Sequence, residues 1–129
     1  MNLDIAFNHN DESSPLNLTQ INRIEELTLS ALEKHHLRLL AHCLQVFKSI
    51  PVESDGKNFP SKQEQLEWWL SNPKLKNDRE FILLLIEQFD SAAIQLERVA
   101  KALQILPMQL TLDDLIFDAI SRSSNSSSQ

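Results

Sequence analysis

Glycine, cysteine and tyrosine are the residues that this 129-residue chain uses least, with one glycine, one cysteine and no tyrosine. Sandwiches and barrels of β-strands are rich in aromatic residues and punctuated by glycine, whereas this chain is rich in helix formers such as leucine, glutamate, glutamine, lysine and alanine. A single cysteine also excludes an intramolecular disulfide. The composition therefore predicts an all-α protein.

Long apolar runs and positive charge are scarce as well. The longest uninterrupted apolar run, FILLLI at 81–86, is too short to span a bilayer, and no signal-peptide pattern is present. The formal net charge is −6, so the chain lacks the positive field that draws phosphates to nucleic-acid-binding proteins. We expect a cytoplasmic protein that binds neither a membrane nor nucleic acid.

The length fits one domain, which capping residues and prolines divide into helices. Residues 1–15 and 122–129 are polar and have no sustained apolar period, which predicts disordered ends around a helical domain over 16–121. Inside that domain the pattern predicts a bundle of about four helices, two long and two short. The expected helices run from Leu18 to Ile50, from Ser61 to just before Pro73, from Asn77 to Leu106 and from Thr111 to Ile120.

The clearest apolar pattern lies in the third expected helix. Its apolar residues repeat at spacings of three and four without a break, as in the seam of a heptad pattern. Such a seam is more typical of a bundle core than of a ligand site. We therefore expect the two long helices to form the core and the short ones to cover its ends. The seam consists of Ile82, Leu85, Phe89, Ala92, Leu96, Val99, Leu103 and Leu106.

The first long helix carries apolar residues on two different sides. The apolar residues in the second half of this helix follow a heptad pattern and lie on one side. When the same pattern is continued toward the N-terminus, Ile21, Ile24 and Leu27 fall on the opposite side of the helix. Either the chain breaks near residues 28–30, or one continuous helix packs against two neighbours. The simplest second neighbour is another copy of the chain, which makes these three residues a candidate homodimer surface. Trp68, at the margin of the short second helix, is a further candidate contact for a protein partner.

Three of the four histidines and the only cysteine fall within LEKHHLRLLAHC, which raises the question of a metal site. The heptad register places His36 and Cys43 on the core seam and the other two histidines on its flank. Glu33 and His36 have the Glu-x-x-His spacing of di-iron bundles, but the chain has no second copy of that motif. A zinc site would need two more ligands, and the third helix has no histidine or cysteine. We therefore expect an inert core thiol, a half-buried histidine and no cofactor.

Patterns that indicate catalysis are missing from the sequence. It has no glycine-rich phosphate loop, no Gly-x-Ser-x-Gly turn and no pair of carboxylates that can be assigned as acid and base. We predict a non-enzymatic interaction or regulatory module that acts as a homodimer. The alternative interpretation is a metal-binding bundle that holds zinc or a di-iron centre with Glu33, His36 and Cys43.

Overall fold

The computed structural model describes residues 16–52 and 58–127, and in these ranges the regular structure is entirely helical. The all-α class is confirmed, with five helices where the sequence predicted about four. The disorder expected for residues 1–15 lies outside the described residues. No helix within the described ranges has the length and apolar character needed to cross a membrane. The elements are α1 (Leu18–Glu25), α2 (Ala31–Ser49), α3 (Lys62–Leu70), α4 (Arg79–Leu103), a 3₁₀ turn (Pro107–Gln109) and α5 (Leu112–Ser127).

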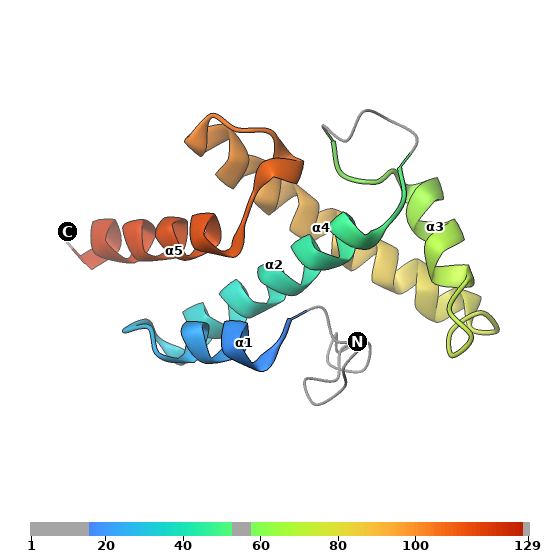
Figure 1. The fold of residues 1–129 in the computed structure, drawn as a ribbon, viewed down its shortest axis with the longest axis horizontal. Helices are drawn as coiled ribbons and strands as arrows, with labels where there is room; N and C mark the ends of the chain where they lie inside the picture. The colour runs from blue at the N-terminus through green and yellow to red at the C-terminus, as the bar shows by residue number, and fades with distance from the viewer. Residues whose placement is uncertain (1–15, 53–57, 128–129) are drawn as a thin grey trace.

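The two long helices, α2 and α4, cross at the centre of the molecule (Figure 1). Helices α1 and α5 pack against α2, and α3 packs against α4. Aromatic rings fill the junction of α2, α3 and α4. Phe89 lies edge-on to Phe47 with ring centroids 5.5 Å apart, and Trp69 approaches the same ring at 5.5 Å. The predicted arrangement, with the long pair at the core, is confirmed.

The heptad seam of α4 is buried from Ile82 to Val99. The helix ends at Leu103, earlier than expected, because Gln104 adopts a left-handed conformation with φ 60° and its backbone N–H donates to carbonyl oxygens of the last turn. Leu106 consequently lies beyond the helix and is exposed. The N-cap is Asp78, one residue after the predicted start, and its carboxylate accepts from the backbone N–H of Phe81 at 3.1 Å.

The first predicted helix is broken near residues 28–30, which was one of the two possibilities. Helix α1 ends at Glu25, and Ser30 starts α2 by accepting a hydrogen bond from the backbone N–H of Glu33 at 3.1 Å. Because the chain turns between the two helices, α1 lies against α2 in the same molecule. The change of apolar side in the sequence is therefore explained by the break.

The position of α1 corrects the predicted homodimer surface. Ile24 is 0% exposed within a single chain, and Ile21 and Leu27 are half-buried against the same core. Their apolar side is covered by the chain's own helices, so these three residues do not form an open surface for a second copy. The homodimer itself stays a prediction, without the surface on which it was based.

Helix α5 begins as predicted and ends later than predicted. At its start, Thr111 and Asp114 exchange hydrogen bonds between their side chains and backbone N–H groups. The helix then continues past Ile120 to Ser127, into the stretch expected to be disordered. An ion pair one turn apart, between Arg122 and Asp118, supports the added turn.

Candidate functional site

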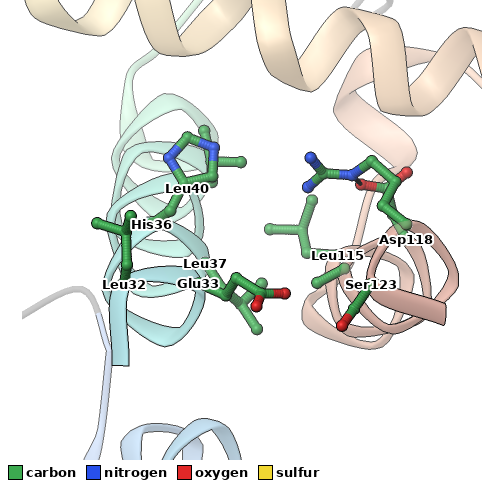
Figure 2. A pocket seen from close by; sticks show the side chains of 10 residues that line it. Leu32, Glu33, His36, Leu37, Leu40, Leu115, Asp118 and Ser123 are labelled. Carbon is green, nitrogen blue, oxygen red and sulfur yellow. Dashed lines mark hydrogen bonds and ion pairs between the residues drawn. The ribbon is translucent and has the colours of Figure 1, made fainter. Parts of the chain in front are cut away.

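A groove of about 480 Å³ opens between the N-terminal half of α2 and α5 (Figure 2). Leu37, Leu40, Leu115 and Ala119 line it, and each is otherwise buried in the core. Leu32 stands at its edge with 77% of its surface exposed. The groove is therefore an opening through which the apolar interior of the bundle reaches the surface.

Polar side chains from both helices border the apolar lining. On α5, Arg122 Nε lies 2.8 Å from Asp118 Oδ2, so these two opposite charges compensate each other. On α2, the half-buried carboxylate of Glu33 points toward α5 (Figure 2) and has no ion-pair partner among the described residues. His36 and Ser123 complete the border. The groove thus carries one uncompensated negative charge.

The alternative metal ligands are not brought together. Glu33 and His36 line the groove, whereas Cys43 is 1% exposed in the core. Since Cys43 follows His36 by two helical turns, the two residues are about 10 Å apart along the axis, too far for one metal ion. Within residues 16–52 and 58–127, no three His, Cys, Asp or Glu side chains are placed to hold a metal together. The geometry therefore gives no support to a zinc or di-iron centre at these three residues.

The inward-facing histidine differs from the one that the heptad register predicted. His42 is 2% exposed, and His36 is only half-buried at the groove. The reason is that α2 is covered on every side in its middle, where all five residues from Leu40 to Leu44 are buried. A heptad count assumes one buried face, so it could not identify the core histidine in this part of the helix.

The thiol of Cys43 is unsuited to nucleophilic chemistry. Burial raises its pKa from 9.0 to about 12, because the thiolate would be desolvated in the apolar core. At neutral pH the group is a neutral thiol without access to a substrate. Its environment matches the inert core residue expected from the sequence.

Trp68 and Trp69 take different positions on α3. Trp69 is buried in the core, while Trp68 is half-buried at the end of the helix, at the margin where the sequence predicted it. The two rings meet edge-to-face, with centroids 4.8 Å apart. Trp68 also lines a second, separate pocket and takes no part in the α2–α5 groove.

The α5 wall of the groove was missed in the sequence because the last helix was expected to end at Ile120. Two signals could have revealed it. Leu115 and Ala119 have the i, i+4 spacing of an apolar helical face, and Asp118 and Arg122 have that of a stabilising ion pair. Together they predict a helix that continues past residue 120 with one apolar side and a charged border.

The described residues thus form an all-α domain with a largely apolar groove between two of its helices. Residues 16–125 match the family model described as NDH complex assembly factor CRR9. This match covers most of the chain and all but the end of α5, and the chain therefore belongs to that family. No curated protein and no solved structure gives a significant match.

Proposed function

We propose that this protein takes part in assembly of the NDH complex by binding a helix of one of the complex's proteins in the α2–α5 groove. The family description supports the assembly role. The observation that carries the proposal is the groove itself, which is lined by core leucines of α2 and α5 and edged by the exposed side chain of Leu32. A protein that binds an assembly partner in this way needs no catalytic group.

The dimensions of the groove suit a short stretch of helix. On α2 it is lined from Leu32 to Leu40, and on α5 from Leu115 to Ser123. At a rise of 1.5 Å per residue, each wall is about 12 Å long, which corresponds to roughly two turns of a bound helix. Such a helix would place apolar residues at spacings of three and four between the two walls.

The charges of the groove restrict the partner further. Asp118 is compensated by Arg122, but the Glu33 carboxylate is not compensated by any described residue. A bound helix would displace water from this carboxylate, and burial of an unpaired charge is unfavourable. The partner helix is therefore expected to carry a lysine or arginine that meets Glu33.

Site-specific photo-crosslinking tests the proposal. A photoreactive amino acid at position 32, in the full chain expressed in its own cells, should give crosslinks to proteins of the NDH complex. The same amino acid at position 94 is the matched control, since Ile94 is also an exposed apolar residue, on α4 and outside the groove. Equal crosslinking from both positions, or none from position 32, would contradict the proposed site.

Two further predictions from the sequence accompany this proposal. Homodimerisation is still an expectation, and crosslinks from position 32 to a second copy of the chain would identify that copy as the occupant. The cytoplasmic location also stays an expectation, which fractionation of the cells would check. Neither is needed for a partner helix to bind in the groove.

A further inference from the structure

A second pocket, of about 420 Å³, lies at the C-terminal end of α3. It is lined by Trp68, Ser71, Asn72, Pro73 and Lys74. Helix α3 is at the opposite end of the molecule from α5 (Figure 1), so this pocket is separate from the α2–α5 groove.

The walls of this pocket are held in place by the fold. The ring of Trp68 rests edge-to-face on buried Trp69. The hydroxyl of Ser71 donates to the Trp68 carbonyl oxygen at 2.5 Å, and the Asn72 side-chain oxygen accepts from the backbone N–H of Lys74 at 2.9 Å. The backbone carbonyl of Asn72 accepts two more N–H groups of the following turn. The backbone around the pocket is therefore preorganised, so that exposed side chains such as Lys74 account for most of the conformational entropy lost on binding.

The polar groups that this pocket offers to a ligand are mainly hydrogen-bond donors. The indole N–H of Trp68, the side-chain amide N–H of Asn72 and the ammonium of Lys74 have no partner among the described residues. The hydroxyl proton of Ser71 is already used within the chain, and none of the described residues that line the pocket has a carboxylate. A ligand that complements this set must supply acceptors, and a negatively charged acceptor makes the strongest bonds to it.

We infer that this pocket binds a carboxylate from an acidic peptide segment of a partner protein. The surrounding charge favours such a segment, because Lys76 follows on the same loop and Arg79 begins α4, both exposed and without ion pairs to described residues. The nearby carboxylate of Asp78 is engaged as the N-cap of α4. This segment is a local concentration of cations on a chain whose formal net charge is −6.

A peptide fits the pocket better than a small inorganic anion does. The ring faces of Trp68 and Pro73 are apolar, and they contribute to binding only when the ligand also brings apolar surface. An acidic segment supplies both parts, with a carboxylate for the donors and its methylene groups or a neighbouring side chain for the rings. This site goes beyond the groove proposal and does not depend on it.

Nuclear magnetic resonance of the ¹⁵N-labelled full chain tests the inference. The probes are a short blocked peptide rich in glutamate and leucine, its counterpart with glutamine in place of glutamate, and inorganic phosphate at equal ionic strength. We expect the glutamate peptide to shift the indole N–H signal of Trp68 and the side-chain amide of Asn72, and Trp68→Phe assigns the indole signal.

Charge variants provide the decisive comparison. Lys74→Glu should weaken binding of the glutamate peptide by about tenfold or more, since it removes a charge-assisted bond. Lys101→Glu, which changes an exposed cation on α4 away from the pocket, should not. The inference is overturned if the glutamine peptide binds equally well, if phosphate shifts these signals and the peptide does not, or if no probe shifts them.

Discussion

Arg23 of α1 forms an ion pair with Asp113 in the first turn of α5, ninety residues away in the sequence. The Arg23 side chain is about half exposed and that of Asp113 mostly exposed, so the pair itself contributes at most about 1 kcal/mol to stability. The pair is important because it shows that α1 reaches the start of α5. Helix α1 also packs along α2, and it therefore touches both of the helices that form the groove.

Replacement of Ile24 by alanine is expected to lower the free energy of unfolding by about 2–4 kcal/mol, as truncation of a fully buried isoleucine does. Ile24 is 0% exposed, and its loss leaves a cavity between α1 and the core. Leu18→Ala in the same helix is the control, because Leu18 is mostly exposed and should change stability by less than about 0.5 kcal/mol. Urea denaturation of both variants provides the measurement. Similar small losses in both would place the apolar side of α1 outside the core.

Replacement of Glu33 by glutamine is expected to weaken the association with the NDH complex by several-fold, while the loss of its charge from the first turn of α2 lowers stability by less than about 1 kcal/mol. The variant keeps the shape of the side chain and removes only the charge that the partner's lysine or arginine is expected to meet. Glu97→Gln, at an exposed position of α4, is the matched control and should associate normally. Copurification measures the association with the complex, and thermal denaturation followed by circular dichroism measures the stability of each variant. Tighter association of the glutamine variant would contradict a basic partner.

Because the thiol of Cys43 is buried, we expect the folded protein to become less stable at high pH. Burial raises its pKa to about 12 in the folded chain, whereas the unfolded chain titrates near the ordinary value of 9.0. The unfolded state therefore loses the proton first, and stability should fall between pH 9 and pH 12, by at most about 1.4 kcal/mol per pH unit. Cys43→Val lacks this thiol, so its stability should fall less than that of the wild type in urea titrations at pH 8 and pH 10.5. Equal losses would indicate an accessible thiol, as would rapid alkylation of the native protein.

Gln104 offers a site for stabilisation. It ends α4 in the left-handed conformation, φ 60° and ψ 41°, which residues with a Cβ atom adopt at a cost of about 1 kcal/mol. Gln104→Gly should therefore raise the free energy of unfolding by a few tenths to about 1 kcal/mol, and Gln104→Val should lower it. Thermal denaturation of the two variants measures the difference. A destabilising glycine would mean that the helix does not end in this conformation.

Local signals in the sequence predicted much of the fold. The capping boxes of Asn17 with Gln20 and of Ser61 with Glu64 are both present in the structure, and the heptad seam of α4 is buried as expected. These features depend on hydrogen bonds or contacts within a few residues, which a single sequence encodes directly. The same kind of signal, Ser30 three residues before Glu33, also marks the start of α2.

The groove could not be predicted to the same extent, because it depends on how α5 sits against α2. Leu37 and Leu115 line the same groove because α2 packs against α5, and no spacing in the sequence specifies which helices leave an opening between them. The change of apolar side before residue 28 was equally ambiguous. This change of side was compatible with a continuous helix packed against a second copy of the chain and also with a turn in the chain. In the structure, Ile24 is buried within a single chain, which supports the turn.

The level of assembled NDH complex in cells that carry Leu32→Glu tests whether the α2–α5 groove binds a protein of the complex. Leu32 is exposed at the edge of the groove and lies in the first turn of α2, where a glutamate is compatible with the helix. Ile94→Glu, at an exposed apolar position of α4, is the matched control. We expect Leu32→Glu to lower the amount of assembled complex while the variant protein itself is present at the normal level, and Ile94→Glu to leave the amount of complex unchanged. A normal amount of complex in the Leu32→Glu cells would contradict binding in the groove.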